Sequence, residues 1–258
     1  MSKTSPLDGF RFAFGTLTVL PVGVTRWDRG AARAGMLVAP VVGVVVGGCA
    51  AGVGLLLLVL GAGPLLAAVG SVAVPAVLTR GLHLDGLADT ADGLGSGKPA
   101  EDALRIMKQS DIGPFGVLAL VFVVLAQVAA LAQVYGDSWG RGVAAAVVSG
   151  IAGRLALTWA ARVGVPAARP EGLGAAVAGV VPVRWALGLG VGVVVVGWAC
   201  GVALGIYGVG PAFVVALVVG ELLLRHCRRR FGGVTGDVFG GLAESAATAA
   251  VVVLSLGG

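Results

Sequence analysis

The sequence has 258 residues, of which 57% are hydrophobic and only 12% are charged. Soluble globular proteins carry about 25% charged residues, so this composition, with a mean hydropathy of +0.99, excludes an ordinary soluble fold. The 18 basic and 13 acidic residues leave a net charge of +5, which we attribute to basic cytoplasmic loops rather than to nucleic-acid binding. We therefore expect an all-α polytopic transmembrane helical bundle that forms a single domain over residues 1–258.

In chain order, the first apolar stretch, Phe10–Val24, is short and interrupted by Arg11, and we expect an interfacial or re-entrant segment there. Longer apolar runs follow, and a helix needs about 20 such residues to cross a membrane. The most polar segment, residues 80–111, follows the second run. The sequence predicts about seven spans, at Met36–Leu60, Leu65–Leu78, Ile112–Tyr135, Val143–Val163, Trp185–Tyr207, Pro211–Leu224 and Gly241–Leu256.

The basic residues between these runs alternate from one connection to the next. Residues 1–35, 80–111, 164–184 and 225–240 are basic, whereas residues 61–64 and 208–210 carry no charge and residues 136–142 have Arg141 as their one basic residue. Because cytoplasmic loops carry the excess of Lys and Arg, we expect a bacterial cytoplasmic-membrane protein with a cytoplasmic amino terminus. Four spans separate residues 80–111 from residues 225–240, which places both segments on the cytoplasmic side.

Three carboxylates stand out in the polar stretch Leu82–Gly97, at Asp85, Asp89 and Asp92. In a helix their directions fall near 0°, about 40° and about −20°, so all three share one face. Oxygen ligands of this kind suit Mg²⁺ or Mn²⁺, and we interpret the cluster as a metal site for a substrate phosphate. The alternative is a solvated loop whose acids balance nearby basic residues.

Other polar residues are candidates for the same chemistry. Lys108 is placed to meet a phosphate, and Ser110 or Asp111 is placed to cap the following helix. The run Gly232–Asp237, read as GGVTGD, permits close approach of backbone to a ligand at Gly233, Thr235 and Gly236, and Asp237 is a candidate ligand or base. Ionisable residues within spans are costly and face the bundle interior. Further candidates for substrate contact are Arg154, Glu244 and His83.

At these motifs the chain resembles the cobalamin synthase family, and the resemblance covers essentially its whole length. The most specific part is the run HLDGLADTADG at His83–Gly93. Further matches are Leu17–Pro21, Pro40, Gly43, Met107-Lys108, Gly113, Gly116, Glu171–Gly174, Gly232–Asp237 and Glu244. The chain departs from the family pattern at two places. Val19 replaces a frequent Arg, and Gln109-Ser110-Asp111 replaces an Asp followed by Ser-Arg, which puts a direct role for positions 109 and 111 in doubt.

The resemblance implies a magnesium-dependent membrane enzyme that joins adenosylcobinamide-GDP to α-ribazole or its 5′-phosphate and releases GMP. We expect Asp85, Asp89 and Asp92 to hold Mg²⁺, and Asp237 or Asp92 to act in catalysis. We expect a second group to bind substrate or its phosphates: His83, Lys108, Ser110, Arg154, Gly233, Thr235, Gly236 and Glu244. Two alternatives stay open at this point, a CDP-alcohol-type membrane phosphotransferase and a cation transporter.

Overall fold

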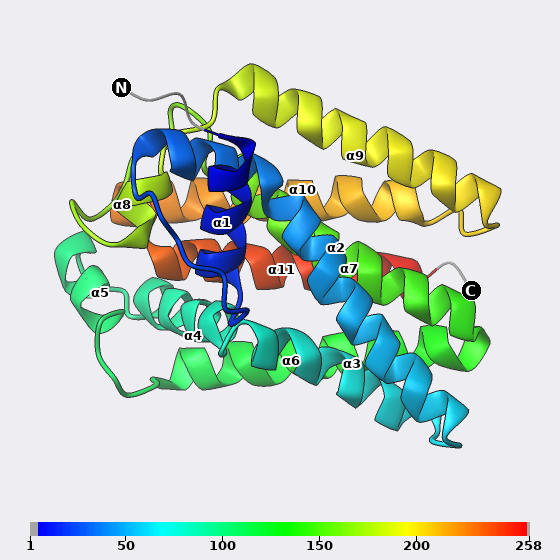
Figure 1. Cartoon of the computed structure of the whole chain (residues 1–258). Helices are drawn as coiled ribbons and strands as arrows, with labels where there is room; N and C mark the ends of the chain where they lie inside the picture. The colour runs from blue at the N-terminus through cyan, green and yellow to red at the C-terminus, as the bar shows by residue number, and fades with distance from the viewer. Residues whose placement is uncertain (1–4, 257–258) are drawn as a thin grey trace.

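The computed structural model describes residues 5–256, and in that range the regular secondary structure is helical. The only β pairing among these residues is two isolated bridges, Arg162–Val181 and Ala167–Val234. The helices are α1 (Pro6–Leu17), α2 (Arg29–Val59), α3 (Pro64–Leu78), α4 (Leu82–Gly95), α5 (Ala100–Ile106), α6 (Pro114–Asp137), α7 (Trp139–Ala160), α8 (Leu173–Val177), α9 (Val183–Ala203), α10 (Val209–Phe231) and α11 (Gly236–Ser255). Figure 1 shows them as an elongated bundle. The ends of the expected single domain, residues 1–4 and 257–258, lie outside the described residues.

Six helices are long and apolar enough to cross a membrane: α2, α6, α7, α9, α10 and α11. A seventh candidate is the pair α3 and α4, which bends by 87° at the junction between the two helices. The predicted all-α bundle of about seven spans is therefore confirmed. The second predicted span ends with α3 and does not continue straight into the acidic motif, because α4 turns away from α3.

The amino-terminal segment forms the 12-residue helix α1, which is not among the candidate spans; the predicted interfacial or re-entrant placement stays a prediction. Ser5 caps α1 through a capping box with Asp8, and Phe12 of the same helix is fully buried. Asp28 caps α2 by accepting hydrogen bonds from the backbone N–H groups of Gly30 and Ala31. The Ala31 N–H and the Arg26 guanidinium hold the pKa of Asp28 below its ordinary value.

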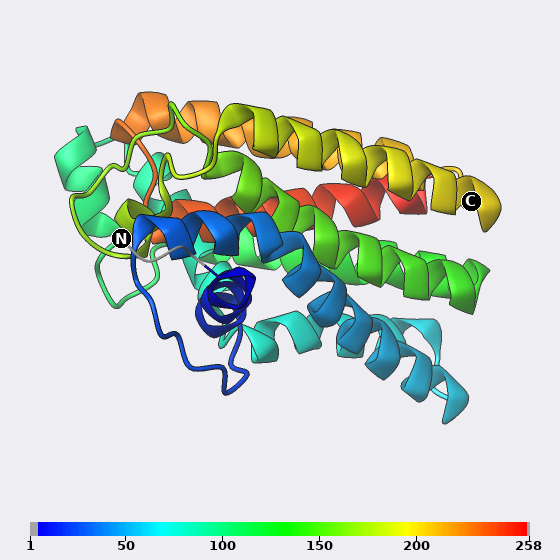
Figure 2. The ribbon, with the colours of Figure 1, turned by 45° about the horizontal axis from the view of Figure 1, so that its top comes forward.

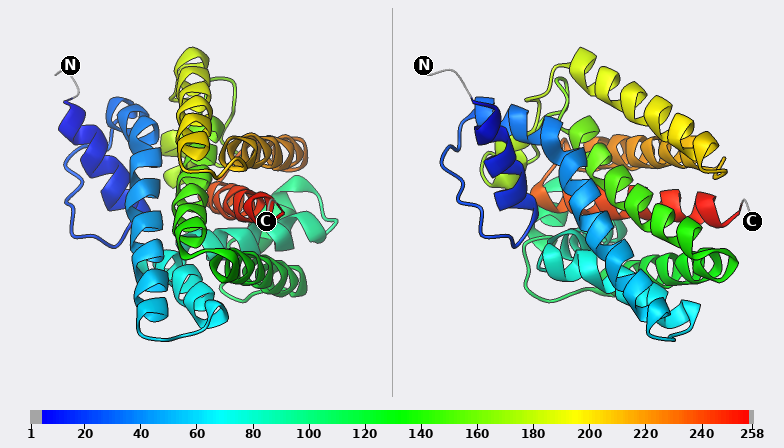
Figure 3. Two further views of the ribbon diagram at one scale, coloured as in Figure 1. Left: turned by 90° about the vertical axis from the view of Figure 1, so that its right-hand side faces the viewer. Right: turned by 45° about the vertical axis from the view of Figure 1, so that its right-hand side comes forward.

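Close packing between α2 and α7 forms the spine of the bundle. Gly43 and Gly47 of α2 lie one turn apart and face Gly150 of α7, and a Cβ added at Gly43 would lie 2.5 Å from the carbonyl oxygen of Gly150. This is the small-residue packing that membrane helices use where no hydrophobic force drives them together. Viewed along the bundle, α11 lies inside, next to α4, α6, α7 and α10, and α9 lies at the outer edge (Figure 3).

The connections with the functional motifs meet at one end of the bundle (Figures 1 and 2). Arg29 donates to the carbonyl oxygen of Ala178 at 3.2 Å, and Arg33 donates to that of Val180 at 3.0 Å. At the same end Arg230 donates to the carbonyl oxygen of Lys98. The prediction that residues 80–111 and 225–240 share one end is thus confirmed. The opposite end holds the connections α2–α3, α6–α7 and α9–α10.

Candidate active site

The site is built where α4 crosses α11. Gly86 of α4 lies against the backbone of α11, since a Cβ added there would be 2.6 Å from the carbonyl oxygen of Asp237 and 3.1 Å from the Cα of Gly240. A Cβ added at Gly240 would in turn be 3.0 Å from the carbonyl oxygen of His83. Any side chain at this crossing would push the helices apart. Glycine at both positions therefore brings Asp85 and Asp89 of α4 beside Asp237 in the first turn of α11.

The crossing gathers negative charge around Asp89. The carboxylates of Asp85, Asp92 and Asp237 all lie close enough to Asp89 to repel it electrostatically, and the Arg169 guanidinium lies close enough to attract it. Asp237 is the member of this group that is paired directly, with its Oδ2 3.2 Å from Nη1 of Arg169. Among the residues that the structure describes, Asp85 and Asp89 form no ion pair. Such a cluster requires a further cation or protonation.

Asp92 makes a contact that its helical position does not predict. Its side chain is buried, and its two oxygens accept hydrogen bonds from the backbone N–H groups of Gly113 at 2.8 Å and Gly116 at 2.9 Å. These groups belong to the first turn of α6, which begins after Gly113. Asp92 therefore caps α6 from another helix. The prediction that Ser110 or Asp111 would cap this helix is wrong, because the distant carboxylate takes that place.

The donor set at the crossing fits a hard divalent cation. Asp85, Asp89 and Asp237 present carboxylate oxygens, the ligands that Mg²⁺ prefers, and Asp85 and Asp89 have no ion-pair partner among residues 5–256. In that same range, however, no three His, Cys, Asp or Glu side chains converge tightly enough to hold a metal as they stand. Binding would have to draw the carboxylates together. The metal, and the assignment of Asp85, Asp89 and Asp92 as its ligands, stay predictions.

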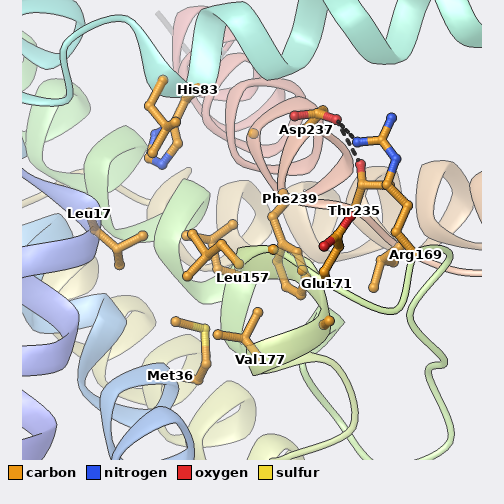
Figure 4. A pocket seen from close by; sticks show the side chains of 18 residues that line it. Leu17, Met36, His83, Leu157, Arg169, Glu171, Val177, Thr235, Asp237 and Phe239 are labelled. Atoms are coloured by element: carbon orange, nitrogen blue, oxygen red, sulfur yellow. Dashed lines mark hydrogen bonds and ion pairs between the residues drawn. The ribbon is translucent and has the colours of Figure 1, made fainter. Parts of the chain in front are cut away.

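A cavity of about 250 Å³ opens beside the crossing (Figure 4). One wall is polar, with Asp237 and Thr235 from the start of α11 and Arg169 and Glu171 from the loop before α8. His83 of α4 lies across from them, buried, and its Nδ1 has no hydrogen-bond partner among the described residues. The floor is apolar, and its side chains come from five helices: Leu17, Met36, Leu157, Val177 and Phe239.

Arg169 is the site residue that sequence reasoning missed. Its Nη1 donates to Asp237 at 3.2 Å, and its Nη2 donates to the carbonyl oxygen of Leu104 in α5 at 2.5 Å. The loop before it is held against residues 233–234 by backbone hydrogen bonds from Ala168 to Val234 and from Val234 to Pro166. In the sequence, Arg169 is one more basic residue in a basic loop. The one signal was its position two residues before the matched run Glu171–Gly174.

Some residues of the GGVTGD run pack against neighbouring backbone, and others line the cavity. Gly233 is needed for packing, because a Cβ there would lie 2.5 Å from the carbonyl oxygen of Pro166. Thr235 caps α11 by accepting from the N–H of Val238 at 3.2 Å, and its hydroxyl donates to Asp237 at 3.1 Å. Gly236 lines the cavity beside them. The run thus starts α11 with its positive end facing the cavity.

Four predicted substrate-binding residues lie elsewhere. Arg154 and Glu244 line a separate cavity of about 30 Å³ within the bundle, where Gln127 donates to Glu244 at 3.0 Å. Within residues 5–256, Nε and Nη2 of Arg154 have no hydrogen-bond partner. Arg154 lies close enough to His83 to interact with it electrostatically. Lys108 and Ser110 are exposed in the loop that precedes α6.

Together the fold and the site define a polytopic helical membrane protein with a carboxylate-lined site at one end of its bundle. The chain belongs to the cobalamin-5-phosphate synthase family, whose pattern matches residues 9–255. It is 43% identical to an adenosylcobinamide-GDP ribazoletransferase of Frankia casuarinae, over 95% of this chain and 94% of that protein. Proteins of the same name match from Nocardioides sp. (39% identical; 95% of this chain, 97% of the relative) and Escherichia coli K12 (36%; 88% and 91%). No solved structure matches the chain.

Proposed function

We propose that this chain is an adenosylcobinamide-GDP ribazoletransferase of the cytoplasmic membrane. The family match and the relatives' shared name support this activity. The observation that carries the proposal to particular residues is the crossing of α4 and α11, which brings Asp85 and Asp89 near Asp237 and Arg169, the two residues that line the cavity. Acids and an Arg in this arrangement suit transfer at a pyrophosphate, where charge must be balanced and the reacting groups aligned.

In the proposed reaction, a ribose hydroxyl oxygen of α-ribazole, or of its 5′-phosphate, attacks the phosphorus that bears cobinamide. A phosphorus–oxygen bond forms with the ribose, the bond from that phosphorus to GMP breaks, and GMP leaves with the electron pair. Asp237 lines the cavity, and we assign it the proton of the attacking hydroxyl. Arg169 then meets the negative charge of the pyrophosphate with a guanidinium that Leu104 holds in place.

Magnesium belongs to this proposal as the cation that the carboxylates would hold. When bound, Mg²⁺ neutralises charge on the transferred phosphoryl group. Asp85 and Asp89 are the residues we assign to it, and Asp237 beside them is left to take the proton. The oxygens of Asp92 already accept two backbone hydrogen bonds. We further propose that the site faces the cytoplasm, because the basic connections lie at its end of the bundle.

The test is an assay of the purified protein with adenosylcobinamide-GDP and α-ribazole, with GMP release and cobalamin formation followed together. We expect turnover with Mg²⁺ and a loss of at least 100-fold after chelation with EDTA, reversed when Mg²⁺ is restored. No GMP release from well-folded protein with Mg²⁺ would overturn the proposed activity. Transfer from CDP-diacylglycerol to an alcohol by the same sample would favour the CDP-alcohol alternative instead.

A further inference from the structure

The floor of the 250 Å³ cavity is more apolar than a site for pyrophosphate and ribose requires. Leu17, Met36, Leu157, Val177 and Phe239 are each at most 6% exposed, and all belong to one core cluster. They nevertheless line the open space beside Asp237 and Arg169. Phosphates and sugar hydroxyls lose hydrogen bonds to water on such a surface and are disfavoured there. The floor therefore favours an apolar ligand group over a polar one.

The two sides of the cavity define the shape of that ligand. Figure 4 shows Thr235, Asp237, Arg169 and Glu171 on the right and the labelled apolar side chains to their left and below. A ligand that satisfies both has an apolar, compact group joined to a group rich in hydroxyls. The volume of about 250 Å³ is somewhat below the range of about 300–1,000 Å³ typical of ligand cavities, which is room for a compact group such as a nucleoside base.

Of the groups in the proposed reaction, the base of α-ribazole has this chemistry. It is a dimethylbenzimidazole, an aromatic ring system with two methyl groups and few polar atoms. Guanine has several donors and acceptors on its edges, which the apolar floor would leave without partners. We propose that the apolar floor is the subsite that holds the nucleoside base and directs its ribose toward Asp237. This inference rests on the proposed function, whose substrates it places.

The subsite extends to α8, where Ala175 lines the same cavity. Its side chain is half-buried, so a larger residue there would add bulk to the cavity without opening a hole in the core. Ala175→Leu adds about three carbon atoms. Since one methylene in an apolar pocket changes recognition by about 10- to 200-fold, we expect the KM for α-ribazole to rise at least 10-fold. The KM for adenosylcobinamide-GDP and the kcat should stay within about twofold of the wild type.

A substrate change makes the test specific to the base. The nucleoside analogue that lacks both methyl groups should be less affected by Ala175→Leu than α-ribazole is, because the smaller base leaves room for the added side chain. The matched control is Ala199→Leu on α9, where the alanine is exposed on the outer edge of the bundle. That variant should keep both KM values.

The outcomes separate this inference from the proposed function. An unchanged KM for α-ribazole in an active Ala175→Leu enzyme, or a rise confined to adenosylcobinamide-GDP, would overturn the base subsite and leave the activity standing. If the wild type releases no GMP, the proposed function fails, and equilibrium dialysis with labelled α-ribazole tests the subsite directly. Binding that weakens about 10-fold in Ala175→Leu would support it, and no binding to the wild type would overturn it.

Discussion

Asp89 and Asp92 lie three residues apart on α4, and the structure gives their carboxylates different surroundings. Asp92 is buried and accepts two backbone hydrogen bonds from the start of α6. Asp89 has negative neighbours in Asp85, Asp92 and Asp237. The carboxylate at Asp92 therefore stabilises the fold, whereas the carboxylate at Asp89 adds repulsion that folding does not need. A residue that the fold disfavours in this way is a candidate for function.

The change Asp89→Asn should lower kcat/KM at least 100-fold without lowering the melting temperature in detergent. The substitution removes one charge of the proposed Mg²⁺ site and one source of repulsion. The change Asp92→Asn, in contrast, should lower the stability of the fold, because an amide offers only one oxygen to the two N–H groups of α6. We expect a loss of about 1–2 kcal/mol, the usual cost of removing a helix cap.

Steady-state kinetics and thermal melting of both variants, purified in parallel, check this pair. Near-normal turnover in Asp89→Asn would remove the metal-site argument. An unchanged melting temperature in Asp92→Asn would show that the cap on α6 contributes little to stability. If that variant also lost turnover, Asp92 would be a member of the active site.

For individual residues, the sequence predicts where the site lies better than it predicts which residues form it. Spacing on a helix correctly places Asp85 and Asp89 together, since α4 is unbroken through Gly86. It cannot show that Asp92 reaches α6, because the contact joins residues 21 and 24 positions apart. Arg169 was missed for the same reason. Arg154 and Glu244 were assigned to substrate because buried charge in a span is costly, and Glu244 also because it matches the family pattern.

Among the elements, the bend between α3 and α4 decides where the acidic motif lies. The two helices meet at 87°, and the turn uses positive φ angles at Arg80 (52°) and Gly81 (71°). Gly81 is followed directly by α4, whose first residue is Leu82. Glycine adopts this conformation freely, whereas a residue with a Cβ pays about 1–2 kcal/mol for it.

The change Gly81→Ala should therefore lower the free energy of unfolding by about 1 kcal/mol. Nothing lies within 4 Å of the added Cβ, so the cost comes from the backbone conformation and not from a clash. Arg80→Gly is the matched control, because it relieves the strain at the neighbouring position and should not destabilise the protein. Denaturant or thermal unfolding in detergent measures both. Equal stability of Gly81→Ala and the wild type would mean that the bend tolerates a Cβ.

Hydropathy and charge predict the spans well but do not predict the bend between α3 and α4. Each predicted apolar run contains most of one helix, for example Ile112–Tyr135 for α6 (Pro114–Asp137). Apolar length reports what lipid can cover, which is why this part succeeds. The bend after α3 depends on backbone angles at two residues, and α5 and α8 are too short for a periodic pattern. These elements shape the site, and only the structure reveals them.

For the whole molecule, charge and chemistry are concentrated at the same end. The connections at the site end are basic and touch one another, as Arg29 with Ala178 and Arg230 with Lys98 show. The connections 60–63 and 204–208 at the other end carry no charge. From the positive-inside rule we propose that the basic end faces the cytoplasm. A nucleotide-linked substrate would then meet the carboxylates without crossing the membrane.

Single-cysteine labelling tests this orientation. In a background with Cys49, Cys200 and Cys227 replaced by alanine, we place one cysteine at Gln109, exposed at the site end, or at Tyr207, exposed in the opposite connection. A membrane-impermeant maleimide applied to intact cells should label Tyr207→Cys and should label Gln109→Cys only after permeabilisation. The cysteine-free protein controls for background, and GMP release by each variant shows that the fold is kept. The opposite pattern would place the carboxylates outside the cell, where the proposed cytoplasmic reaction has no access to its substrates.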